Sequence, residues 1–261
     1  MVNNWTLVCI NNYTIFDIDM KITFLSDTHN KHKYLNGDLP GGDLLIHAGD
    51  LSSMGYKHEI QSFCGWYDKL NNYDHKVFIA GNHDWGFIDP VEFALSGKKN
   101  VRIPDTTKEI LASYKNIDYL QDDFIYIGED WGDLVKIWGS PWQPEFHDWA
   151  FNLPKNSDLL KEKWDMIHND VDILVTHGPA FGYVDKVTSY SPNLGCELLV
   201  ERIKEFKPKI HVCGHIHSGH GYVFDGDTHF INAAVLDERY NYTNSPLSVE
   251  WNPKTNELEF L

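Results

Sequence analysis

Short apolar runs recur along the chain, and each run ends at a glycine or a polar residue. Five of these runs are apolar at nearly every position, which is typical of strands buried on both faces of a sheet. They cover residues 22–26, 44–48, 77–80, 173–176 and 210–213. We therefore expect a sheet-based core in which these segments are the central strands.

Apolar residues at helical spacing lie between several of these strands. The spacing predicts helices over residues 56–70, 159–168 and 195–206, the last ended by Pro208. Residues 118–142 and 222–261 predict further strands, with turns at Asp225-Gly226 and Asn252-Pro253. The alternation of strands and helices favours an α/β fold.

Each of the five buried strands ends in residues that can bind a metal ion. The candidate ligands are Asp27, His29, Asp50, Asn82, His177, His215 and His217. Ligand-binding residues in open α/β sheets gather at the carboxyl ends of the strands, so we expect these side chains to converge on one edge. Oxygen and nitrogen donors without a thiolate suit a divalent ion of moderate hardness.

Seven donors are too many for one ion. If one carboxylate bridges two ions, the seven residues give about four protein contacts per ion, with room for a bridging hydroxide and a substrate. Two metal ions about 3.5–4 Å apart form a clamp for in-line attack on phosphorus. Each aspartate taken alone could equally end a strand as a turn or cap residue, and it is the ordered set that favours metal binding.

Other residues near these strands have plainer interpretations. His47 and His211 alternate along strands that reach the site, so they are either support for the ligands or buried core histidines, and we favour the core interpretation. The segment 138–151 is rich in Trp, Phe and Pro. It predicts either a packing loop, which we favour, or a wall that stacks a nucleotide base.

Composition limits the partners. The 261 residues carry a formal net charge of −16 and show no basic stripe, which argues against long nucleic acid as a partner. No apolar run is long enough for a membrane span, and residues 1–19 do not resemble a signal peptide. The four cysteines are far apart, which indicates neither disulfides nor a thiolate site and favours a reducing, cytoplasmic location. We interpret residues 1–19 as an N-terminal extension and 20–261 as one domain.

The order of the strand-end motifs resembles one superfamily. Asp27-x-His29, Gly49-Asp50, Gly81-Asn82-His83-Asp84, His177-Gly178 and Gly214-His215-x-His217 are similar to the motifs of the calcineurin-like metallophosphoesterases. Residues 139–146, 149–154 and 213–217 further resemble the small single-domain metallophosphoesterase-domain-containing proteins. The resemblance implies a four-layer αββα sandwich with the metal site at one edge of the central sheets.

The resemblance also implies a role for each motif residue. The first ion would be held by Asp27, His29, Asp50 and His217, and the second by Asp50, Asn82, His177 and His215. His83 would face the phosphate and stabilise or protonate the leaving oxygen. Asp84 would orient the His83 imidazole, although it could instead cap the following turn.

We expect a binuclear metal-dependent phosphoesterase. The first expectation is a phosphodiesterase that acts on small or nucleotide diesters, with a metal-bridged hydroxide as the attacking group. The ions would be Mn, Fe, Zn or Ni, with Mn the choice in vitro. Two alternatives stay open: a phosphomonoesterase acting on nucleotides or phosphoproteins, and a weakly active nucleotide-binding regulatory protein. The expected partner is a small phosphate ester rather than a membrane, and the sequence leaves the oligomeric state open.

Overall fold

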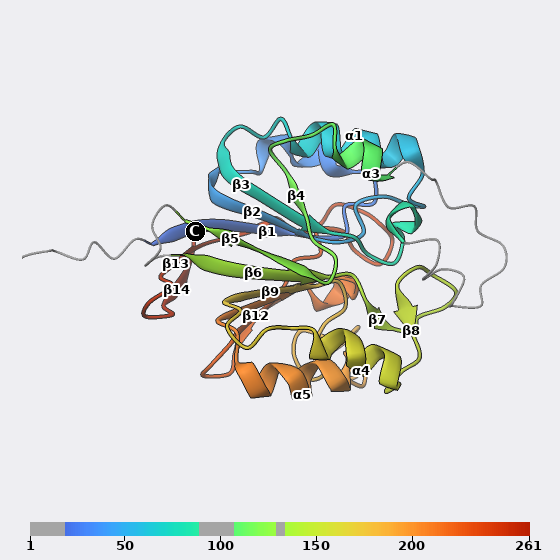
Figure 1. The fold of residues 1–261 in the computed structure, drawn as a ribbon, viewed down its shortest axis with the longest axis vertical. Coiled ribbons are helices and arrows are strands. Elements are labelled where there is room, and N and C mark those ends of the chain that lie inside the picture. The colour runs from blue at the N-terminus through green and yellow to red at the C-terminus, as the bar shows by residue number, and fades with distance from the viewer. Residues whose placement is uncertain (1–18, 89–106, 129–133) are drawn as a thin grey trace, which may run out of the picture.

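Two six-stranded mixed sheets pack against each other, and helices cover the outer face of each sheet (Figure 1). The computed structural model describes residues 19–88, 107–128 and 134–261. Helices α1 (Lys57–Tyr67) and α3 (Thr107–Leu111) cover the first sheet, and α4 (Asp158–Asp165) and α5 (Glu197–Phe206) cover the second. The four-layer αββα sandwich expected from the sequence is confirmed.

The first sheet has the strand order β14-β13-β1-β2-β3-β4. Its strands are β1 (Met20–Leu25), β2 (Gly42–Ala48), β3 (Tyr73–Ile79), β4 (Asp118–Tyr119), β13 (Leu247–Trp251) and β14 (Leu258–Phe260). Strands β1 to β4 run parallel, and β13 pairs antiparallel with β1. The carboxyl ends of β1, β2 and β3 therefore lie at the same edge.

The second sheet has the strand order β11-β12-β10-β9-β6-β5. Its strands are β5 (Asp123–Ile127), β6 (Val135–Ser140), β9 (Ile173–Thr176), β10 (Ile210–Cys213), β11 (Gly221–Phe224) and β12 (His229–Asn232). Its inner strands are parallel, because β9 pairs in this way with both β6 and β10. Hairpins join β11 to β12 across Asp225-Gly226 and β13 to β14 across Asn252-Pro253, as the turn residues predict.

Small elements complete the described chain. Strands β7 (Gln143–Pro144) and β8 (Asn152–Leu153) form a short parallel pair. Three 3-10 helices span His32–Gly37, Trp85–Phe87 and His217–Gly219. The two short strands and the last two 3-10 helices lie among the loops that follow the central strands.

The strands are apolar at successive positions because both of their faces are buried. Ile46 of β2 packs between the two sheets, whereas its neighbour Leu45 faces the layer under α1. Ile173 and Leu174 of β9 divide in the same way between the inner layer and the layer under α4 and α5. Alternation in each strand thus supplies one core between the sheets and one beneath each helical layer.

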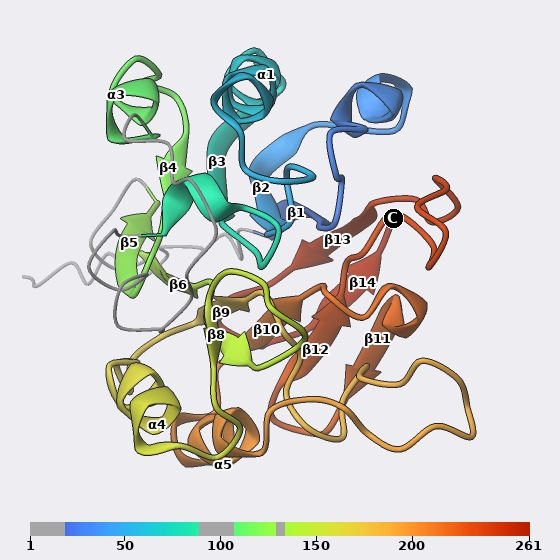
Figure 2. The same ribbon diagram turned by 90° about the vertical axis from the view of Figure 1, so that its right-hand side faces the viewer.

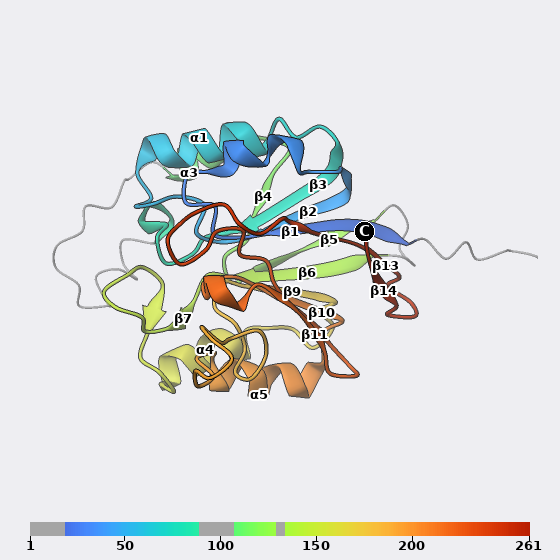
Figure 3. The ribbon, with the colours of Figure 1, turned by 180° about the vertical axis from the view of Figure 1, so that it is seen from behind.

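The loops after the central strands of both sheets meet at one edge of the sandwich. Figure 2 looks onto this edge, with α1 and α3 above it and α4 and α5 below it. The C-terminus lies at the opposite end of the sheets from β7 (Figure 3). The edge to which the sequence assigns the metal ligands is therefore built from both sheets.

The interpretation of residues 1–19 as an extension falls outside the described residues, except for Asp19, whose carboxylate accepts a hydrogen bond from Asn252 Nδ2 at 3.0 Å. Cys64, Cys196 and Cys213 are buried free thiols. Within the described ranges, no helix combines the length and the apolar character needed to cross a membrane.

His211 is a completely buried histidine in β10. Thr176 Oγ1 donates its hydrogen to Gly178 O at 2.8 Å, so its oxygen must accept from His211 Nε2, also at 2.8 Å. His211 Nδ1 is buried without a hydrogen-bond partner. Burial lowers the pKa of His211 to about 3, so the ring is neutral in the folded protein.

We expect His211 to make the protein acid-sensitive. Between pH 6.5 and about 3 the unfolded chain binds a proton at this residue and the folded chain does not, so stability falls as the pH is lowered through this window. Between pH 7 and pH 5 the wild type should lose about 2 kcal/mol more unfolding free energy than His211→Gln. Urea unfolding at both pH values measures the difference, and parallel losses in the two proteins would contradict the assignment.

Candidate metal centre

The predicted ligands, which lie far apart in the sequence, come together at the shared edge of the two sheets. Asp27 and His29 follow β1, Asp50 follows β2 and Asn82 follows β3, all in the first sheet. His177 follows β9, and His215 and His217 follow β10, in the second sheet. The side chains of Asp27, Asp50 and His177 offer ligand atoms that all lie within 4.8 Å of one another.

Asp50 lies between two groups of imidazoles. Its Oδ2 is 3.6 Å from His29 Nε2, and its Oδ1 is 3.4 Å from His177 Nε2. The carboxylate therefore presents one oxygen to each side, which is the arrangement required of a residue that bridges two ions.

On the first side, two imidazoles and a carboxylate converge. His217 Nε2 lies 3.3 Å from Asp27 Oδ1 and 3.4 Å from His29 Nε2. These three residues form one group that could hold a metal ion, and His29 also belongs to a second such group with Asp50 and His83. Asp27, His29, Asp50 and His217 are thus arranged around a common point.

On the second side, His177 Nε2 is 3.0 Å from Asn82 Oδ1 as well as close to Asp50. The His215 ring lies 5.2 Å from the His177 ring, measured between centroids. Its backbone N–H donates to both oxygens of Asp27, at 3.1 and 3.0 Å. The contact between His215 and Asp27 thus ties the two sheets together within the site.

Backbone carbonyls fix the orientation of two histidine rings. His177 Nδ1 donates to Ala48 O and His217 Nδ1 donates to Asp237 O, each at 2.9 Å, because a carbonyl oxygen can only accept. Each ring therefore presents Nε2 to the centre. Such hydrogen bonds orient histidine ligands in metal sites and raise their basicity.

Two buried carboxylates dominate the electrostatics. Burial alone raises the pKa of Asp50, but the charges of His177 and His83 hold it well below its ordinary value. Burial lowers the pKa of His177 and His217, yet their contacts with Asp50 and Asp27 respectively raise both to about 9. The carboxylates thus stabilise the protonated form of these imidazoles, and the same negative charge would attract a cation at this place.

Four of the predicted ligands have an unusual backbone. Asp27, His29, Asp50 and His215 have positive φ angles of 55°, 38°, 55° and 66°. Residues other than glycine adopt this region at a cost, and such strain concentrates at functional sites. The neighbouring glycines allow close approach: a Cβ on Gly81 would collide with the Asp50 carboxylate, and one on Gly214 with Asp27.

His83 borders the first group without being one of the seven ligands. Its Nε2 is 4.0 Å from Asp50 Oδ2, and its Nδ1 donates to Ser53 O at 2.8 Å. The Trp149 ring stacks on it with centroids 4.0 Å apart. The imidazole is therefore held on one face and at one nitrogen, with Nε2 directed to the centre.

The role of Asp84 in orienting the His83 imidazole stays a prediction, and the contacts of its carboxylate lie in the neighbouring loops. The Asp84 carboxylate accepts from Gly81 N, from Leu51 N, and from both N and Oγ of Ser52. Burial and the charge of Asp50 raise its pKa to about 7. Asp84 therefore joins the loops after β2 and β3. Its side chain makes no capping hydrogen bond to the 3-10 helix Trp85–Phe87 that it precedes.

His47 and His211 are core histidines that also contact the ligand loops. His47 Nδ1 accepts from Gly49 N, so its Nε2 donates to Thr28 Oγ1 at 3.0 Å, between Asp27 and His29. His211 makes the equivalent contact with Thr176, the residue before His177. Both histidines are thus buried in the core, and both also contact residues next to the predicted ligands.

The aromatic segment 138–151 divides in two. Trp138 and Trp142 are buried in the core, as a packing segment requires. Trp149 stacks on His83, and Phe146 lies edge-on to His215 with centroids 5.1 Å apart. The far end of the segment therefore borders the predicted metal ligands.

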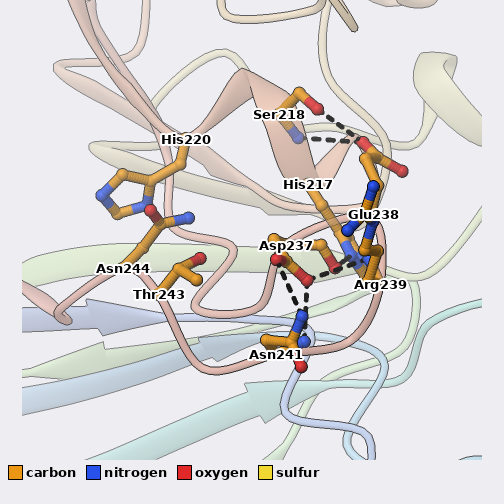
Figure 4. Close-up of a pocket in the computed structure, with 9 residues that line it drawn as sticks. All are labelled: His217, Ser218, His220, Asp237, Glu238, Arg239, Asn241, Thr243 and Asn244. Atoms are coloured by element: carbon orange, nitrogen blue, oxygen red, sulfur yellow. Dashed lines mark hydrogen bonds between the residues drawn. The ribbon is translucent and has the colours of Figure 1, made fainter.

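Tyr240 is a site residue that the sequence did not reveal, because it lies in a polar loop without a recognised motif. Its ring lies edge-on to His29 at 4.8 Å and to His217 at 5.5 Å, measured between centroids. The same loop lines a cavity of about 380 Å³ beside His217, in which Ser218 bonds to Glu238 and Asp237 bonds to Asn241 (Figure 4).

Comparison of the sequence with known proteins identifies a family. A family model described as calcineurin-like phosphoesterase matches residues 20–219. Human metallophosphoesterase domain-containing protein 1 is 38% identical over 229 residues, which cover 87% of this chain and 69% of the relative. The Caenorhabditis elegans UPF0046 protein T07D4.2 is 38% identical over 223 residues, which cover 80% of this chain and 54% of the relative.

Solved structures share the fold at low sequence identity. The crystal structure of TT1561 from Thermus thermophilus superposes with a TM-score of 0.58 at 14% identity, covering 94% of this chain and 99% of that one. A 5'-nucleotidase from Candida albicans superposes with a TM-score of 0.50 at 16% identity, covering 89% and 47%. At these identities the similarity concerns the fold alone.

The geometry of Asp50 leads to a test of metal binding. Asp50→Asn should reduce the content of both ions, because one neutral amide cannot replace a carboxylate that faces two imidazole groups. Asp27→Asn should chiefly reduce one ion, since the Asp27 carboxylate lies against His217 on one side. Elemental analysis after dialysis against a divalent metal measures both variants, and a fully retained ion in Asp50→Asn would exclude the bridging role.

Proposed function

The chain belongs to the calcineurin-like phosphoesterase family, and from this membership we propose that it is a binuclear metal-dependent phosphodiesterase for small phosphate diesters. Asp27, His29, Asp50 and His217 would hold one divalent ion. Asp50, Asn82, His177 and His215 would hold the other. The donor set of carboxylates, imidazoles and one amide oxygen, without a thiolate, fits ions such as manganese, iron, zinc or nickel.

One observation carries the proposal. The two oxygens of Asp50 face different imidazoles at 3.6 and 3.4 Å, and His83 Nε2 lies 4.0 Å from the same carboxylate. Two bound ions would polarise the phosphate and supply a water of lowered pKa. The group that would handle the proton of the leaving oxygen therefore stands next to the place where the phosphate would bind.

The chain's own residues prepare His83 for this role. Because Nδ1 donates to Ser53 O, Nε2 is the nitrogen through which the ring would exchange a proton with a substrate. Trp149 covers one face of the ring, which restricts its rotation. His83 would thus donate a proton to the departing alkoxide from a fixed position.

The surroundings support a diester rather than a monoester. A diester carries a second organic substituent, and the cavity beside His217 offers space of about 380 Å³ for it. Tyr240 lies in the loop that lines this cavity, between Arg239 and Asn241 in the chain, and its ring lies against His29 and His217. The polar side chains of the cavity, among them Ser218, Thr243 and Asn244, suit a substituent rich in oxygen or nitrogen.

Removal of the His83 imidazole should separate catalysis from metal binding. We expect His83→Ala to lower turnover by about 10²- to 10⁴-fold, the usual contribution of a positioned proton donor. Its metal content should stay that of the wild type, because the seven proposed ligands remain. His58→Ala, an exposed histidine in α1, is the matched control. Parallel losses of metal and activity would instead make His83 a ligand.

A paired substrate assay tests the proposed reaction itself. The wild type loaded with manganese should hydrolyse a bis-aryl phosphate faster than the corresponding mono-aryl phosphate, and a chelator should abolish both activities. A preference for the monoester would replace the proposal with a phosphomonoesterase. Nucleotide binding without turnover across several metals would replace it with a regulatory protein.

A further inference from the structure

We propose that Gln143 and Asn152 form an amide relay that forces Asn82 to present its oxygen, rather than its NH₂ group, to the second metal position. The inference rests on the proposed metal site and assigns positioning roles to two residues outside the ligand set. An asparagine side chain has an oxygen and a nitrogen at similar positions, and only the oxygen can bind a cation.

The relay begins at two backbone carbonyls. Asn152 Nδ2 donates to Phe146 O at 3.0 Å and to His147 O at 3.1 Å. Because carbonyl oxygens only accept, the NH₂ group of Asn152 must point toward them. Asn152 Oδ1 therefore faces the other way, toward Gln143.

Gln143 carries this orientation onward. Its Nε2 donates to Asn152 Oδ1 at 3.2 Å and to Asn82 Oδ1 at 3.4 Å. If the Gln143 amide were turned over, its oxygen would face Asn82 Oδ1 and Asn152 Oδ1. Two hydrogen bonds would then be replaced by repulsive contacts between oxygens. The NH₂ group of Gln143 thus requires an oxygen from Asn82 at this point.

The three side chains are almost completely inaccessible, with exposed fractions of 1% for Asn82, 1% for Gln143 and 5% for Asn152. Water is therefore a poor substitute for a lost partner, and a misdirected buried amide costs the desolvation of its polar atoms. The backbone supports the same register, because Ala150 N donates to Asn82 O and Gln143 N donates to Phe151 O, each at 3.0 Å.

His177 is the other described donor to Asn82 Oδ1, through Nε2 at 3.0 Å. That nitrogen is also the atom that would bind the second ion, and a histidine ligand has no proton on its ligating nitrogen. When His177 serves as a ligand, Gln143 Nε2 is thus the donor that continues to hold the Asn82 oxygen. The buried, unpartnered Oε1 of Gln143 is consistent with an amide whose direction is dictated by its NH₂ group.

The test is a double-mutant cycle read out by metal binding. Gln143→Met removes the donor at similar side-chain volume and should weaken one of the two ions by about 10- to 100-fold, as is usual for the loss of a hydrogen bond to a ligand. Asn82→Asp provides a ligand whose two oxygens are equivalent, so orientation no longer matters. In that background, Gln143→Met should weaken the same ion by less than about 3-fold. Gln61→Met, an exposed glutamine of α1, controls for the substitution itself.

Isothermal titration with manganese measures both affinities in all variants, and thermal unfolding in chelator measures stability. Two ions bound by Gln143→Met as tightly as by the wild type would overturn the relay. An equal loss in the presence and absence of Asn82→Asp would also overturn it, since this is the result of a purely structural defect. Turnover is not among these measurements. A wild type that binds two ions but does not hydrolyse esters would therefore contradict the proposed function alone. The relay would still be supported or overturned by the manganese affinities of the variants.

Discussion

The site depends on the compensation of two buried carboxylates. Asp27 and Asp50 lie at the edge where two sheets meet, almost without access to water. A buried anion is tolerated only when positive charge or hydrogen-bond donors stand next to it. Imidazoles from the second sheet supply that charge, since contacts with the carboxylates raise the pKa of both His177 and His217 to about 9. With protons exchanged for divalent ions, the same arrangement would form the proposed metal site.

The strained ligand loops follow from this requirement. A side chain at the end of a strand points to one face of its sheet unless the backbone turns there, and Asp27 and Asp50 have the positive φ angles of such a turn. Backbone hydrogen bonds hold the turns in place: Asp27 N donates to Gly49 O at 2.9 Å, and His29 N donates to Asp50 O at 3.0 Å. Hydrogen bonds between the loops after β1 and β2 thus stabilise the positive φ angles in both loops.

Much of this architecture could be predicted from the sequence. Runs such as 44–48 and 173–176 are apolar at every position or nearly so, which identifies buried strands, and the polar residues that follow must then share one edge. The contacts of Asp84 could not be predicted, because they depend on how the loops after β2 and β3 fold against each other. Tyr240 and Gln143 were missed for a similar reason: their contacts are made across loops, where hydrophobic periodicity carries no signal.

The hydrogen bond from His215 N to Asp27 joins residues separated by 188 positions in the chain. Contacts of such separation form slowly, since a long loop must close before they contribute any stability. During synthesis, the amino-terminal ligands can therefore meet their partners only after most of the polypeptide has emerged and the two sheets have packed together. Cation capture would then mark the end of folding, and a bound ion would stabilise only the finished molecule rather than guide its early stages.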